Sequence, residues 1–205
     1  MPPWSLEGTI LTDRQALALA GTLYLLAFPL YGGGQFFLQN QQPFLGLGLV
    51  LANTASVIAI GYLLRSIIRR SSGVVASTVL WGRLIEGLIL AAGAVAYLVL
   101  EGSQTGQYIN EAAYHGAMII LGVAGFIFSA WLFKMRGVPQ ILAGFGVIGY
   151  LSLAAAMVLE RLGQDSTSVW FLAAAGVFEI LFAFWLIFAG LRPRVLNPEK
   201  QAAVR

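Results

Sequence analysis

The sequence predicts an all-α fold, a polytopic transmembrane bundle of six helices with both the N- and C-termini in the cytoplasm. Hydrophobic residues make up 59% of the 205 residues and charged residues only 10%, whereas soluble globular domains carry about 25% charged residues. The apolar residues are grouped in six runs of about 20 residues or more, the length that crosses a hydrocarbon core of about 30 Å. The basic residues lie mostly at the ends of these runs, as in multi-pass membrane proteins.

Six helices are expected to form one transmembrane domain over residues 1–191, followed by a cytoplasmic tail over residues 192–205. The predicted helices span about residues 12–31, 44–70, 74–100, 110–134, 139–161 and 167–191. Each helix has a recognisable start or stop signal in the sequence.

The start of the first helix is marked by Thr12 and Gln15, which form a capping-box pattern. We expect Gly32-Gly33-Gly34 to end this helix, because glycine is a poor helix former. The amide-rich segment 35–42 is then predicted to be a loop. Pro43 suits the first position of a helix and marks the start of the second one.

Short turns separate the remaining helices. Ser71-Ser72-Gly73 predicts a tight turn, so the second and third helices should form an antiparallel hairpin. A loop over residues 101–106 precedes the fourth helix, and Pro139 starts the fifth. Ser166 or Thr167 is expected to cap the N-terminus of the sixth helix.

The positions of lysine and arginine predict how the bundle is oriented. Cytoplasmic loops of multi-pass proteins are enriched in these residues. If the N-terminus is inside, only Arg161 lies on the outer side. The cytoplasmic side then carries Arg14, Arg65, Arg69, Arg70, Lys134, Arg136, Arg192, Arg194, Lys200 and Arg205. We therefore expect a multi-pass protein of the cell inner (plasma) membrane, in contact with the lipid bilayer.

The composition argues against several classes of function. The chain has no cysteine and one histidine, which excludes thiol chemistry and a multi-histidine metal centre. The net charge of +3 is explained by basic residues at helix ends, so we expect no nucleic-acid partner. We also expect no cofactor and no bound metal.

Three charged residues within the predicted membrane spans are the main candidates for a site. Arg83 and Glu86 lie three residues apart on one face of the third helix. Glu179 in the sixth helix is expected at about the same depth, about 18 to 20 Å from the cytoplasmic boundary at 1.5 Å per residue. Charged groups in a bilayer are costly and mark functional candidates. The cluster is interpreted as a structural ion cluster, a ligand site or a proton relay.

The third and sixth helices share a weak sequence similarity around their glutamates. Residues 82–86 and 175–179 each contain a small residue upstream of an apolar residue and a glutamate. If the two halves of the chain were repeats of three helices, they would have inverted topology, as in many transporters.

Other polar residues in the spans have simpler interpretations. His115 is a candidate ligand-binding residue near the outer end of the fourth helix, although a lone histidine more often packs through hydrogen bonds than binds a ligand. Asn53, Thr54 and Ser56 in the second helix are interpreted as residues of close helix packing.

The leading functional hypothesis is a binding, accessory or structural membrane subunit with Arg83, Glu86 and Glu179 as its polar core. Its partners would be a lipophilic or anionic small molecule, other membrane subunits or further copies of the chain. One alternative is a small transporter of a lipophilic or anionic solute. Another is an intramembrane enzyme that uses Glu86 or Glu179. The sequence contains no recognisable catalytic signature, so we favour a non-enzymatic role and assign no catalytic residue.

Several short motifs follow one another in a characteristic order along most of the chain. They are Gly21-Thr22-Leu23-Tyr24-Leu25-Leu26, Arg83-x-x-Glu86, Tyr114-His115, Phe178-Glu179 and Gly190-Leu191-Arg192-Pro193. In this respect the chain resembles a family of bacterial integral membrane proteins catalogued as domain of unknown function 4386. The resemblance implies six membrane helices and no established activity.

Overall fold

The fold is known from a computed structural model, which describes residues 11–40, 42–163 and 168–191. All regular structure in these ranges is helical, which confirms the all-α prediction. The helices are α1 (Asp13–Gln39), α2 (Pro43–Ile68), α3 (Gly73–Val99), α4 (Gln104–Met135), α5 (Gln140–Arg161) and α6 (Ser168–Phe188). The predicted tail and the predicted caps Ser166 and Thr167 lie outside the described residues.

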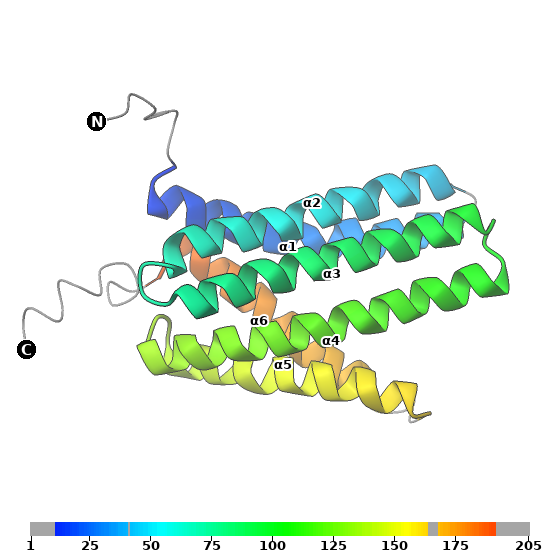
Figure 1. Ribbon diagram of the computed structural model, residues 1–205. Coiled ribbons are helices and arrows are strands. Elements are labelled where there is room, and N and C mark those ends of the chain that lie inside the picture. Colours follow the sequence, from blue (N-terminus) through cyan, green and yellow to red (C-terminus); the bar gives the residue numbers. More distant parts are fainter. Residues whose placement is uncertain (1–10, 41, 164–167, 192–205) are drawn as a thin grey trace, which may run out of the picture.

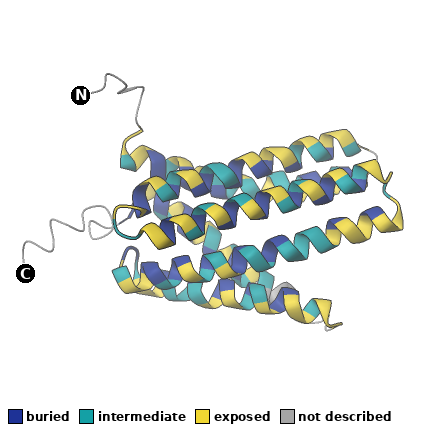
Figure 2. Ribbon diagram, in the orientation of Figure 1, coloured by how far each residue is buried: buried dark blue, intermediate teal, exposed yellow. Residues whose placement is uncertain are grey.

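The bundle has the surface of a membrane protein. Helices α1 to α5 are long and apolar enough to cross a membrane, and α6 contains the apolar stretch Leu172–Phe188. Large apolar side chains such as Phe44, Ile141 and Ile148 are exposed on the outside, and exposed residues follow the outer faces of the helices (Figure 2). Because such a surface is unstable in water and matches lipid, the chain is a multi-pass membrane protein.

The six helices form a closed ring. Each helix packs against its neighbours in the chain, and α6 also packs against α1. Consecutive helices run in opposite directions, so the start of α1 and the end of α6 lie at the same end of the bundle (Figure 1). Helices α3 and α6 stand on opposite sides of this ring, and residues that they direct inward can meet at its centre.

The expected end of the first helix at the triglycine is wrong, because α1 continues through Gly32-Gly33-Gly34 to Gln39. Gly34 packs against α2, where a Cβ atom would lie 2.8 Å from Val50 Cγ2 and 3.2 Å from the Gly46 carbonyl oxygen. Close backbone contact of this kind is a main source of helix association in lipid. The packing against α2 therefore offsets the low helix propensity of glycine.

Two other boundaries also differ from the prediction. Helix α4 begins at Gln104 rather than near residue 110, because the Ser103 side chain caps it by accepting a hydrogen bond from the Gly106 amide. Helix α6 ends at Phe188 rather than near residue 191. The predicted capping box of Thr12 at the start of α1 and the predicted position of Pro43 as the first residue of α2 are confirmed.

Arg14, in the first turn of α1, forms hydrogen bonds with the last turn of α6. Its guanidinium Nη1 donates a hydrogen bond to the Leu186 carbonyl at 3.2 Å. Its Nη2 donates to the carbonyls of Ile187 at 2.7 Å and Phe188 at 2.6 Å. These carbonyls end α6 and have no partner within the helix. A cation at a helix C-terminus is also favoured by the helix dipole, so Arg14 closes the ring at this end.

Replacing Arg14 by alanine is expected to lower the free energy of unfolding by about 1 kcal/mol. It should also speed hydrogen exchange in the last turn of α6, which hydrogen-exchange mass spectrometry measures. Arg69→Ala is the matched control, because Arg69 is exposed and makes no side-chain hydrogen bond within the described residues. Equal exchange in the two variants would show that Arg14 does not hold the end of α6.

Candidate functional site: a charged cluster beside an internal cavity

Arg83 lies at the centre of the ring and is 6% exposed. It fits there because α2 carries glycine at position 61, where a Cβ atom would lie 3.0 Å from Arg83 Cβ. Its guanidinium carbon lies 4.8 Å from the centre of the Tyr24 ring of α1, a cation–π contact. A glycine and an aromatic ring from neighbouring helices thus create the space for a large cation.

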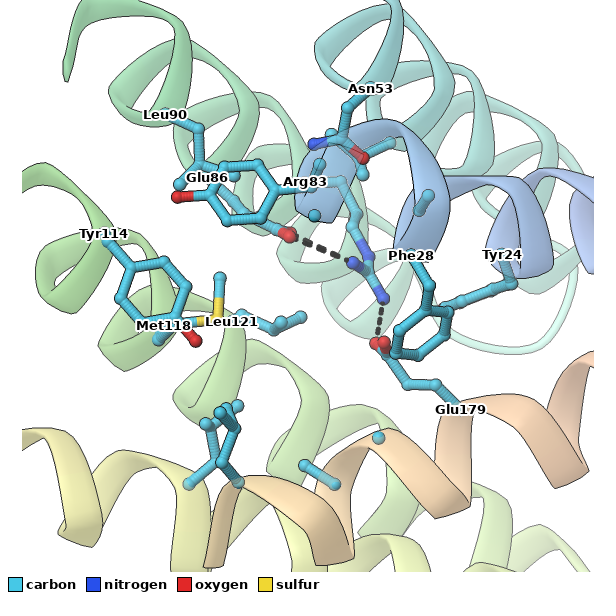
Figure 3. Close-up of a pocket in the computed structure, with 18 residues that line it drawn as sticks. Tyr24, Phe28, Asn53, Arg83, Glu86, Leu90, Tyr114, Met118, Leu121 and Glu179 are labelled. Carbon is cyan, nitrogen blue, oxygen red and sulfur yellow. Dashed lines mark hydrogen bonds and ion pairs between the residues drawn. The ribbon is translucent and has the colours of Figure 1, made fainter. Parts of the chain in front are cut away.

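Two carboxylates hold the Arg83 guanidinium between them (Figure 3). Nη1 donates to Glu86 at 3.0 and 3.2 Å, and Nη2 donates to Glu179 Oε1 at 2.7 Å. Glu86 lies on the same helix, whereas Glu179 comes from α6 on the other side of the ring. The prediction that these three residues meet is confirmed. A cluster of this kind neutralises part of the cost of placing charges among membrane helices.

Tyr150 of α5 completes the cluster by donating a hydrogen bond from its hydroxyl to Glu179 Oε1 at 2.8 Å. Its ring is held by Phe178 at a centroid distance of 5.4 Å and by Gly125, where a Cβ atom would lie 2.6 Å from the ring. Neither Tyr150 nor Tyr24 was predicted as a site residue, although Tyr24 lies in one of the motifs shared with the family. Tyrosines near the middle of apolar spans were the available signal, because a hydroxyl buried in lipid needs a partner.

The cluster is not balanced in charge. One guanidinium faces two carboxylates, so the three groups together carry one net negative charge when all are ionised. Glu179 Oε1 accepts hydrogen bonds from both Arg83 and Tyr150. Its second oxygen accepts none from the described residues. With both carboxylates ionised, the site therefore retains an unused acceptor and a surplus negative charge.

A cavity of about 280 Å³ adjoins the cluster, and all six helices contribute to its wall. Arg83, Glu86 and Glu179 line one part of it, with Tyr24 beside them. The remaining wall is mostly apolar or aromatic. It includes Tyr31 of α1, Asn53 of α2, Leu90 of α3, Tyr114 of α4, Leu153 of α5 and Gly176 of α6.

The wall of the cavity reaches the outer surface of the bundle at α1. Phe28 and Gly32 of α1 line it, yet Phe28 is 39% exposed and Gly32 is also exposed. Across from them, a Cβ atom on Gly176 would lie 3.6 Å from the Phe28 ring. Because α1 is long and apolar enough to cross a membrane, this edge of the cavity faces lipid.

Asn53 has an unusual position in the cavity wall. The residue is 2% exposed, and its Oδ1 atom has no hydrogen-bond partner among the described residues. Buried polar atoms almost always have a partner, so such an exception needs an explanation. Its neighbour Thr54 donates to the Gly87 carbonyl at 3.0 Å and fits the expected packing role. Asn53 does not fit that role.

A comparison with protein-family models assigns the chain. The model described as Domain of unknown function (DUF4386) matches residues 40–190, which is most of the chain. The chain belongs to the DUF4386 family. The match includes α2 to α6 and therefore Arg83, Glu86 and Glu179, whereas Tyr24 lies before it. No curated protein and no solved structure matches this DUF4386 protein.

His115 of the DUF4386 chain lies apart from the Arg83 cluster. Its Nε2 lies 3.3 Å from the Glu160 carboxylate of α5, and its Nδ1 lies 2.7 Å from the Glu111 carbonyl. His115 does not line the cavity, although its neighbour Tyr114 does. The described residues contain no group of three or more His, Cys, Asp or Glu side chains that could hold a metal ion.

Proposed function

We propose that this DUF4386 protein is a non-enzymatic binding protein of the membrane, which holds a small lipophilic molecule at the centre of its helix ring. The observation that carries the proposal is the cavity of about 280 Å³ beside the charged cluster. Ligand pockets are mostly apolar with a few polar groups that fix orientation, and this cavity has that composition. Its lipid-facing edge offers a route from the bilayer.

The cavity favours binding over a purely structural role for the charges. A structural cluster would be packed on all sides, whereas Arg83, Glu86 and Glu179 all border open space. A small transporter is the second candidate, because the same cavity reaches the centre of the bundle, where transporter sites lie. An intramembrane enzyme is less well supported, since both carboxylates are engaged by Arg83.

The proposal extends to where the protein resides. Basic residues gather at the end of the bundle where α1 starts, with Arg65, Arg69 and Arg70 near the end of α2 and Lys134 and Arg136 at the end of α4. This asymmetry supports a cytoplasmic location for that end and insertion in the plasma membrane. The apolar outer surface also leaves room for other membrane subunits or for further copies of the chain.

Native mass spectrometry of the gently solubilised protein tests the proposal. We expect a small molecule to accompany the wild-type protein and to be lost in Gly176→Leu. The leucine would extend into the cavity beside Phe28, which is the only described neighbour within 4 Å of the added Cβ atom. Gly48→Leu is the matched control, since a Cβ atom at this exposed glycine of α2 meets no described residue within 4 Å.

The two glycine variants separate binding from folding. Loss of the bound molecule in Gly176→Leu but not in Gly48→Leu, with similar thermal unfolding of both, supports a ligand site in the cavity. A wild-type protein that carries no small molecule, even after incubation with lipid extract, would contradict the proposal. The same conclusion would follow if Gly176→Leu retained the molecule in full.

A further inference from the structure

We propose that the ligand class of this cavity is a lipophilic amine in its ammonium form, rather than an anion. This inference rests on the proposed binding function. Its first basis is charge, because two carboxylates face one guanidinium in the cavity wall. A net negative charge surrounded by apolar helices is costly, and a cation in the cavity would neutralise it.

The hydrogen-bonding groups of the wall point to the same class. Both terminal nitrogens of Arg83 already donate to carboxylates, so an anionic ligand would compete with Glu86 and Glu179 for the charge of this guanidinium. Two acceptors of the wall residues lack a hydrogen-bond partner among the described residues, namely Asn53 Oδ1 and the second oxygen of Glu179. An ammonium group has three donors and no acceptor, and it complements these oxygens.

The size and the aromatic walls of the cavity define the rest of the ligand. A volume of about 280 Å³ corresponds to about nine waters at about 30 Å³ each, which suits a molecule of about ten non-hydrogen atoms. Tyr31 and Tyr114 form a stacked pair with ring centres 5.8 Å apart, and both line the cavity. Aromatic faces attract organic cations. A longer apolar tail could extend into lipid beside α1.

Protons should compete with the amine for the surplus negative charge. At low pH a proton neutralises a carboxylate and removes the charge that attracts the ammonium group. Binding should therefore strengthen as pH rises, and at low pH, where a carboxylate of the empty site is protonated, binding of the ammonium ion should release that proton to the solvent. The described residues that α2 contributes to the wall, Asn53 and Val57, are uncharged. The titratable groups that surround the two carboxylates are Arg83 of α3, Tyr24 and Tyr31 of α1, Tyr114 of α4 and Tyr150 of α5.

Three probes of nearly equal shape test the charge preference in the purified full-length protein. They are 3-phenylpropylammonium, neutral 3-phenylpropan-1-ol and anionic 3-phenylpropanoate. Calorimetric titration in phosphatidylcholine nanodiscs should show the cation binding at least tenfold more tightly than the alcohol, and the anion more weakly than both. The preference for the cation should grow between pH 5 and pH 8, where the probe amine stays charged.

Glu179→Gln is the matched variant, because it keeps the shape of the side chain and removes the surplus charge. We expect the variant to bind the alcohol as the wild type does, and the cation no more tightly than the alcohol. A cation preference that survives in Glu179→Gln would overturn the proposal. If the variant fails to fold, the affinities of the wild-type protein for the three probes, and their pH dependence, still test whether the cavity prefers the cation.

The outcomes separate this inference from the proposed function. Equal binding of cation and alcohol, or tighter binding of the anion, would overturn the amine while leaving the cavity a ligand site. Failure of all three probes, together with an empty wild-type protein in native mass spectrometry, would overturn both. Repeating the titration in nanodiscs that contain phosphatidylethanolamine shows whether the natural amine ligand is a lipid headgroup or a free molecule. Competition there indicates a lipid headgroup amine, and unchanged affinity indicates a free amine.

Discussion

Arg83→Ala is expected to lower the free energy of unfolding by about 3–5 kcal/mol, because it leaves Glu86 and Glu179 buried without a cation. Their side chains are 4% and 13% exposed, so solvent cannot replace the lost interactions. Thermal and denaturant unfolding in mild detergent measure the effect. Arg69→Ala is the control, because this exposed arginine should contribute less than about 0.5 kcal/mol.

A triple variant, Arg83→Met with Glu86→Leu and Glu179→Leu, should be about as stable as the wild type. Replacing a whole buried ion cluster by apolar residues is often neutral or stabilising. The triple variant should nevertheless lose the cavity ligand. A triple variant as unstable as Arg83→Ala would show that the cluster serves stability, and a loss below about 1 kcal/mol in Arg83→Ala would contradict the proposed burial of the charges.

Gly46→Val should be the next most damaging single substitution, with a loss of about 3 kcal/mol in the free energy of unfolding. The backbones of α1 and α2 touch at this glycine, where an added Cβ atom would overlap the Leu38 backbone and lie 2.7 Å from the Gly34 carbonyl oxygen. Neither neighbour is a flexible side chain, so α1 and α2 would have to move apart. Such a shift removes the contacts that hold membrane helices together.

Gly48→Val provides the matched control for Gly46→Val. It makes the same change two residues further along α2, at an exposed position where the added Cβ atom meets none of the described residues within 4 Å. Comparing the two unfolding midpoints cancels the general effect of valine in a helix. Equal midpoints would show that the contact between α1 and α2 at Gly46 does not stabilise the bundle.

Part of the site could be predicted from local position alone. Arg83 and Glu86 are three residues apart on one helix, and the expected depth of Glu179 placed it within reach of both. Tyrosine and asparagine in apolar spans signalled a need for partners, but the sequence did not show that Tyr24, Asn53 and Tyr150 from three other helices would meet at this site. Which apolar positions face inward, and so which hydroxyls and amides meet the cluster, depends on the rotation of each helix in the ring.

Gly32-Gly33-Gly34 shows the same difference between what local sequence predicts and what helix packing decides. Its local propensity predicts a helix end, yet α1 continues because Gly34 packs against α2. Because α1 continues to Gln39, Gln35 is part of the helix. Its side-chain oxygen accepts a hydrogen bond from the Asn110 side chain of α4 at 2.8 Å. A contact with another helix therefore outweighed a local signal.

The sequence by itself determined the properties that depend on composition and on nearby residues. These are the helical class, the apolar lengths that match a bilayer and the capped start at Thr12. Only the tertiary structure decided the closure of the ring through Arg14, the cavity and the unequal charge count around Arg83. The reason is physical, because lipid-facing and inward-facing surfaces of a membrane helix are both apolar. Composition therefore does not reveal which residues meet, and that choice is made when the helices pack.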